Sequence, residues 1–139
     1  DGYQDVEFEL PKRGSSASAG YDIAAIEDTI IPAGTVVLVP TGVKALMLSD
    51  EVLLLYPRSS LAYKRDLIMY NSVGVIDSDY FENESNDGHI MAMLFNAGEE
   101  DVLIEKGERI VQGVFTTYQT TVSDRANESR VGGIGSTGS

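Results

Sequence analysis

An aspartate at the end of an apolar stretch is the strongest candidate for chemistry in this sequence. The segment Asn71–Tyr80 reads NSVGVIDSDY, so Val75 and Ile76 lead directly into Asp77. A carboxylate at the end of a short buried strand is held in place and partly desolvated, and such a group can take a proton from water near neutral pH. Asp77 is therefore the predicted general base, and Gly74 leaves room for a close approach to the backbone.

An ordinary turn after a strand would have a similar sequence, because Asp and Ser are common turn residues. Tyr80, however, follows Asp77 at a spacing suited to a flat platform beside the carboxylate. Four further segments also carry polar or glycine-rich patterns: AGYDI at 19–23, PRSSLA at 57–62, GERIVQ at 107–112 and RVGGIGSTG at 130–138.

These five segments occur in the order and spacing of the motifs of the trimeric dUTPase family, the deoxyuridine triphosphate nucleotidohydrolases. The resemblance spans residues 19–138. It implies hydrolysis of dUTP to dUMP and pyrophosphate, by in-line attack of a water on the α-phosphate. That reaction keeps uracil out of DNA and supplies dUMP for dTMP synthesis. In the resembled family, the aspartate at the position of Asp77 activates the water.

The resemblance also implies how the nucleoside is held. Tyr80 would pack under the deoxyribose, where its ring leaves no space for a ribose hydroxyl, and so UTP would be excluded. The positions that would contact the base or sugar, partly through backbone groups, are Asn71, Gly74, Val75, Ile76 and Met91.

The remaining substrate contacts implied by the resemblance are to the phosphates. They come from a helix start, where exposed N–H groups and hydroxyls bind phosphate oxygens, from the fourth motif and from a glycine-rich flap. The residues are Arg58, Ser59, Ser60, Gln112, Arg130, Ile134, Gly135 and Ser136. Many family members have an aromatic residue where Ile134 stands, so closure over uracil is expected to be weaker here.

The negative net charge of the chain predicts a divalent cation as cofactor. The net charge of −12 repels polyanions, so nucleic acid is not a predicted partner, and a triphosphate needs a cation to offset the field. The resemblance implies Mg²⁺, which Asp22 would touch through water while the substrate phosphates coordinate it directly.

Size and composition favour a single globular domain. The chain has 139 residues and no cysteine, which excludes disulfides and thiolate zinc sites and suits a cytoplasmic protein. No apolar run approaches the ~20 residues that span a bilayer, so no membrane partner is predicted. We expect a β domain at 1–123 and a flexible C-terminal arm at 124–139.

Many short apolar runs separated by turn residues predict an all-β, antiparallel sandwich or barrel-like fold. The resemblance implies the dUTPase-like β-clip, a distorted jelly-roll barrel with one short helix and a glycine-rich flap. Besides an edge strand within 1–13, strands are expected at 21–25, 35–40, 43–48, 52–56, 71–76, 89–96, 102–105 and 110–118. One helix is expected after Pro57, with Ser59 as its N-cap.

The resembled family assembles as homotrimers with shared active sites, in which the tail of one subunit closes over a neighbour, and we expect the same here. Two alternatives remain open at this point. One is a deoxycytidine triphosphate deaminase, although no glutamate stands at the strand that carries Asp77. The other is a regulatory binding module, with a protein partner at the Asn83–Gly88 loop.

Overall fold

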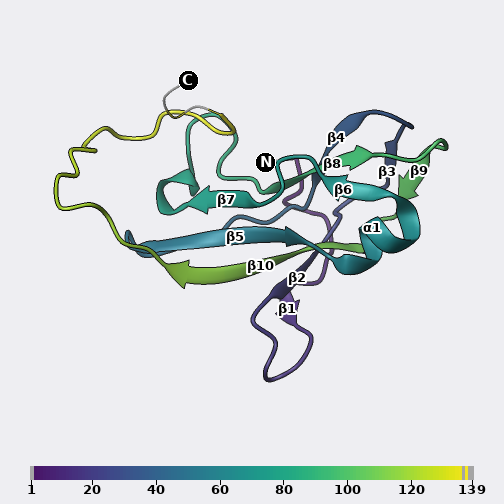
Figure 1. Ribbon diagram of the computed structural model, residues 1–139, viewed down its shortest axis with the longest axis horizontal. Coiled ribbons are helices and arrows are strands. Elements are labelled where there is room, and N and C mark those ends of the chain that lie inside the picture. The colour runs from purple at the N-terminus through teal and green to yellow at the C-terminus, as the bar shows by residue number, and fades with distance from the viewer. Residues whose placement is uncertain (1, 136, 138–139) are drawn as a thin grey trace.

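Short apolar runs and turns fold into three antiparallel sheets in the computed structural model, which describes residues 2–135 and 137 (Figure 1). The larger sheet has the order β1-β2-β10-β5-β7, a second has β4-β8-β6, and β3 pairs with β9. The strands are β1 Lys12–Arg13, β2 Tyr21–Ala24, β3 Thr29–Ile31, β4 Val36–Pro40, β5 Glu51–Pro57, β6 Leu67–Met69, β7 Gly74–Asp77, β8 Met91–Asn96, β9 Val102–Ile104 and β10 Arg109–Thr117. The all-β fold class is confirmed.

The α-helix α1 spans Ser59–Arg65, directly after β5. Its N-cap is Arg58, and no side chain caps the helix, so the expected capping role of Ser59 is wrong. Ser59 is already the first helical residue, which leaves its hydroxyl exposed at the helix start. Nothing in residues 2–135 and 137 forms a helix long and apolar enough to cross a membrane.

The core lies between the sheets and is built from the inward-facing residues of the strands. Leu55 of β5, Leu94 of β8 and Val111 of β10 are each at most 1% exposed. Asn96 is also fully buried, and its side-chain amide donates to the carbonyls of Ile31 (2.9 Å) and Glu100 (2.7 Å). The strands that carry the predicted site residues are therefore fixed from one side by a dry core.

Two strand predictions are wrong, and two observed strands were not predicted. Residues 43–48 pair with no strand, although Val43, Ala45 and Met47 do pack against the core, so the alternation predicted burial but not a ladder. The expected N-terminal edge strand shrinks to Lys12–Arg13. Strands β3 and β6 were not foreseen, since each has only three residues.

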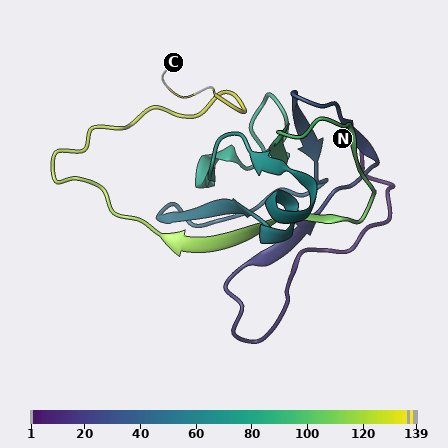
Figure 2. The same cartoon turned by 45° about the vertical axis from the view of Figure 1, so that its right-hand side comes forward.

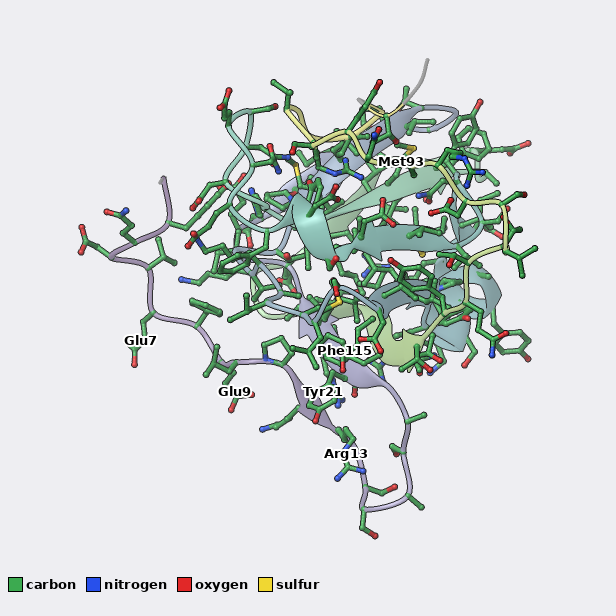
Figure 3. All side chains as sticks on the ribbon, turned by 90° about the vertical axis from the view of Figure 1, so that its left-hand side faces the viewer. Glu7, Glu9, Arg13, Tyr21, Met93 and Phe115 are labelled. Atoms are coloured by element: carbon green, nitrogen blue, oxygen red, sulfur yellow. The ribbon has the colours of Figure 1, made fainter. Side chains whose placement is uncertain are left out.

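The two ends of the chain lie outside the strand core. The segment with Glu7 and Glu9 runs along the outside, and the β1–β2 loop beyond Arg13 projects from the molecule (Figure 3). After β10 the tail leaves the sheet, makes a wide arc and returns over the molecule towards the region of β7 (Figure 2). The polypeptide thus brings its last motif back to its central one.

Candidate active site

A pocket of about 280 Å³ lies between the end of β7, the start of β8 and the returning tail. It collects the residues predicted to hold the nucleoside and most of the described flap. Of the predicted site residues, the lining includes Asn71, Gly74, Val75, Ile76, Asp77, Tyr80, Met91, Arg130, Ile134 and Gly135. Ser136 lies outside the described residues.

Asp77 ends β7 and is less enclosed than its sequence context indicated. Its side chain is 51% exposed, and Val75 before it is 60% exposed. The reason is topological: β7 is the edge strand of its sheet, and among residues 2–135 and 137 it pairs only with β5, so one side of it is open. The expected buried strand and desolvated carboxylate are therefore wrong for the single chain.

Gly74 is required by packing within the chain. A Cβ at this position would lie 3.0 Å from the Leu55 Cβ, because β7 and β5 cross closely where Leu55 pairs with Gly74. Leu55 thus fills one side of the space that the sequence assigned to an approaching ligand. The glycine lets β7 lie close enough to β5 for Asp77 to be fixed at the pocket wall.

Arg130 brings the tail onto the pocket of its own chain. Its side chain is 7% exposed and forms ion pairs with Asp77 (2.6 Å) and Asp79 (2.8 Å). Its guanidinium carbon also lies 5.7 Å from the centre of the Tyr80 ring. The described tail therefore covers the pocket of its own chain, and closure of the tail over a neighbouring subunit stays a prediction.

A second group of predicted residues meets at the other end of the large sheet. Asp22 of β2 is 17% exposed and pairs with Arg58 before α1 and with Arg109 of β10, each at 3.3 Å. Gln112 lies opposite Asp22 in the β2–β10 ladder, and its side chain fills the space beside Gly20. Three motifs far apart in sequence thus form one polar cluster.

The two groups are separated by the length of β5. Val52 pairs with Asp77 at one end of this strand, and Pro57, next to Arg58, ends the other. Five residues of strand at ~3.3 Å each give about 17 Å along the strand axis. Figure 1 shows α1 and the end of β7 at opposite ends of β5.

A family model for dUTPase matches residues 6–138. The chain belongs to the dUTPase family. It is 47% identical over 138 residues to the deoxyuridine 5'-triphosphate nucleotidohydrolase of Lactococcus lactis subsp. lactis (strain IL1403), which covers 98% of this chain and 92% of that protein. The dUTPase of Streptococcus mutans, known from a crystal structure, is 50% identical in sequence, with a TM-score of 0.82. The match covers 85% of this chain and 94% of that one.

A more distant dUTPase, from phage phi11 of S. aureus, has the same fold. It is 20% identical with a TM-score of 0.71, covering 86% of this chain and 90% of that one, and its structure was described for the coordination of a structural Mg(II) ion. The motif-based resemblance is thus confirmed, and so is the enzyme class of the family, dUTP diphosphatase.

The five motifs did not single out every basic residue beside α1. A basic surface pocket of about 380 Å³ beside α1 is lined by Arg58, Lys64, Arg65 and Arg109, among others. Glu108 pairs with Arg65, and Arg109 with Asp22, so each has its own partner across the fold. Lys64 and Arg65 could have been found from the sequence, because they lie one to two helical turns after Arg58.

Proposed function

We propose that this chain hydrolyses dUTP to dUMP and pyrophosphate, with Asp77 as the general base. One observation carries the proposal: a single pocket holds the Asp77 carboxylate, the Tyr80 ring and the open edge of β7. These three features supply a proton acceptor, a platform for a sugar and a row of backbone groups for a base. The product dUMP supplies dTMP synthesis, and removal of dUTP keeps uracil out of DNA.

The edge position of β7 supports recognition of uracil. An edge strand presents N–H and C=O groups that no neighbouring strand uses, and β7 pairs only with β5. Such donors and acceptors match the alternating pattern on the Watson–Crick edge of a pyrimidine. Val75 and Ile76 would present this edge, with Asn71 and Met91 on the neighbouring walls.

The chemical step requires Asp77 to orient a water and take its proton while the α-phosphorus is attacked in line. The Asp77 Oδ2 atom accepts a hydrogen bond from Arg130 at 2.6 Å. When substrate binds, Arg130 leaves this carboxylate for the γ-phosphate, which frees Asp77 for the water. The tail thereby couples closure over the triphosphate to release of the base.

Phosphate binding is assigned to the cluster at the far end of β5. Arg58 and Arg109 provide positive charge, Gln112 an amide, and Ser59 and Ser60 exposed hydroxyls at the start of α1. Because about 17 Å of strand separates this cluster from Asp77, one chain does not complete a site. We therefore assign the phosphate cluster of each site to a second copy, in a homotrimer.

An apolar outer face supports this assembly. The β4-β8-β6 sheet exposes Val36, Leu38 and Ile68, by 40%, 41% and 43%, on the face opposite the core, and the ladder pairs Val36 and Ile68 with Phe95. Tyr70, 61% exposed, continues this surface and contacts Phe95, with ring centres 5.8 Å apart. A contiguous apolar surface of this kind is typical of faces that become buried on association.

Asp22 fits a water-bridged role towards Mg²⁺. Residues 2–135 and 137 contain no group of three His, Cys, Asp or Glu side chains that could hold a metal, so the phosphates would be the direct ligands. Each Asp22 oxygen accepts one long arginine contact, which leaves lone pairs for metal-bound waters. When bound, the cation neutralises phosphate charge.

A nucleotide panel tests the proposal. Wild type is expected to release pyrophosphate from dUTP in the presence of Mg²⁺, and to act far more slowly on UTP, dTTP and dCTP. Asp77→Asn, which keeps the size of the side chain but cannot take the proton, should lose at least a hundredfold in kcat. Ammonia release from dCTP, or an Asp77→Asn variant as fast as wild type, would rule the mechanism out. A protein partner at the Asn83–Gly88 loop stays a prediction.

A further inference from the structure

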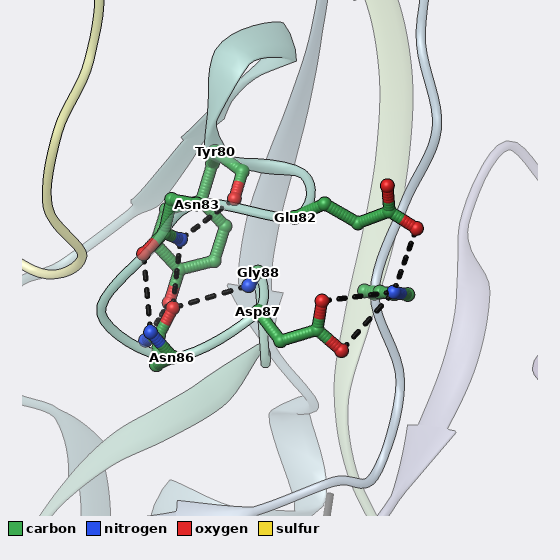
Figure 4. A network of polar contacts seen from close by, with 7 residues as sticks. Tyr80, Glu82, Asn83, Asn86, Asp87 and Gly88 are labelled. Carbon is green, nitrogen blue, oxygen red and sulfur yellow. Dashed lines mark hydrogen bonds and ion pairs between the residues drawn. The ribbon is translucent and has the colours of Figure 1, made fainter.

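The Asn83–Gly88 loop turns its asparagine side chains inward (Figure 4). Asn83 is 7% exposed, and its Oδ1 atom accepts the backbone N–H groups of Ser85 (3.0 Å) and Asn86 (3.1 Å). Its Nδ2 atom donates to the carbonyl of Tyr80 (2.7 Å). Asn83 therefore closes the loop into one turn and ties that turn to the backbone of the sugar-platform residue.

The orientation of the Asn86 amide is determined by its neighbours. Its Oδ1 atom accepts from Nδ2 of Asn83 (2.7 Å) and from the N–H of Gly88 (3.1 Å). With the oxygen facing these two donors, the Nδ2 group faces the Tyr80 hydroxyl and donates to it at 2.8 Å. Asn86 thus contacts the tip of the Tyr80 ring in one amide orientation.

The Tyr80 hydroxyl is held from a second side. It donates to the carbonyl of His89 at 2.7 Å, and since a carbonyl only accepts, the phenolic proton is committed there. The lone pair left on the hydroxyl oxygen accepts from Asn86. One donated and one accepted hydrogen bond fix the end of a side chain that is 5% exposed.

The base of the loop is fixed independently of this network. Lys44 forms ion pairs with Glu82 (3.0 Å) and Asp87 (3.1 Å), and the hydrogen bond that Lys44 donates to Glu82 raises the pKa of Lys44. Gly88 has φ +79°, and a Cβ there would lie 2.8 Å from the Tyr80 carbonyl oxygen. The loop is therefore folded tightly against the segment that carries the ring.

We propose that Asn86 is a positioning residue that sets the discrimination between deoxyribose and ribose. The inference rests on the proposed hydrolysis of dUTP, in which the Tyr80 ring blocks the 2'-hydroxyl. A ring whose hydroxyl is anchored on two sides cannot move away from the sugar. Without the Asn86 amide, the ring gains freedom to yield to a ribose, so UTP becomes a better substrate while dUTP changes little.

Steady-state kinetics on both nucleotides test this role. The readout is the ratio of kcat/KM for dUTP to that for UTP, measured for wild type, Asn86→Ala, Tyr80→Phe and the double variant. Ser85→Ala is the matched control, because Ser85 is exposed and contributes its backbone N–H to the network. Melting temperatures are recorded for all five proteins.

Asn86→Ala and Tyr80→Phe are each expected to lower the ratio about tenfold, the size of effect that one lost hydrogen bond has on a rate ratio. In Asn86→Ala the change should come mainly from UTP, and Ser85→Ala should keep the wild-type ratio. The double variant should lose no more than the larger single loss, because either change alone already removes the hydrogen bond between Asn86 and Tyr80.

A folded Asn86→Ala with the wild-type ratio, or additive losses in the double variant, would overturn the inference. If Asn86→Ala does not fold, Tyr80→Phe decides alone, since it removes the hydroxyl and keeps the ring, and an unchanged ratio there refutes the role. Absence of dUTP hydrolysis in wild type is a separate outcome, because it removes the proposed function and this inference with it.

Discussion

Two inactive variants should restore each other's activity when mixed, if each site takes Asp77 from one chain and Arg58 from another. Asp77→Asn removes the base and leaves the phosphate cluster intact. Arg58→Ala does the reverse, since Arg58 lies at the far end of β5, about 17 Å from the base along the strand. Neither variant alone is expected to release pyrophosphate at more than a small fraction of the wild-type rate.

The expected recovery follows from counting intact sites. In trimers formed at random from equal amounts of both variants, a site has an intact Asp77 with probability one half. It has an intact Arg58 from a different chain with the same probability. About one quarter of the sites are then complete, so the mixture should reach about 25% of wild-type activity. If both residues came from one chain, no site would be complete.

The assay is pyrophosphate release after the two variants are unfolded together, refolded and shown by light scattering to be trimeric. The matched control pairs Asp77→Asn with Tyr80→Ala. These residues line the same pocket of one chain, so no mixture of the two variants restores them together, and activity should stay at background. Activity at background in the first mixture, with mixed trimers present, refutes the shared site.

Three further predictions concern stability and packing. Burial lowers the pKa of His89, whose neutral Nε2 accepts the N–H of Gly42 at 2.9 Å. The stability that neutral His89 contributes is complete above the ordinary histidine pKa of about 6.5 and is lost as pH falls through the lowered pKa. Wild type should therefore lose more stability to urea between pH 7 and pH 5 than His89→Gln. Gly74→Ala, which places a Cβ 3.0 Å from Leu55, should cost about 1–3 kcal/mol and at least tenfold in kcat, whereas Gly14→Ala, with only an ordinary 3.9 Å contact, should change neither. Asn96→Ala leaves the buried carbonyls of Ile31 and Glu100 without their donor and should cost roughly 2–4 kcal/mol in urea denaturation, a loss that would be absent if water replaced the amide.

The grouping of Gly74, Asp77 and Tyr80 in one pocket could be predicted from the sequence because it depends on residue type and local spacing. Asp77, Tyr80 and Gly74 stand within seven residues, and the strand that holds them requires only their own neighbourhood. The exposure of Asp77 was not readable, because it depends on β7 being the edge of a sheet whose order is set by distant pairings. Whether a strand is buried depends on the strands beside it as much as on its own sequence.

The pairing of Arg109 with Asp22 shows the same limit. It follows from the antiparallel register of β2 and β10, which includes a bulge between Arg109 and Val111. No local pattern predicts a contact across 87 residues that depends on such a shift. The Asn86 contact with Tyr80 was missed for a different reason: polar loops are read as solvent-facing, whereas this one forms its hydrogen bonds towards the core side.

The length of β5 links the chemistry to the assembly. The strand is rigid because it pairs on both sides, with β10 and with β7, so its two ends cannot approach each other within one chain. For a triphosphate held at this pocket, the pocket's own chain offers Arg130, and we expect the remaining positive partners, Arg58 and Arg109, to come from another copy. The chain has a net charge of −12 and repels this substrate. Binding therefore depends on arginines that lie close to the pocket of Asp77 and Tyr80. A second copy docked with its Arg58 and Arg109 facing that pocket would meet both requirements, so we expect association to be required for catalysis.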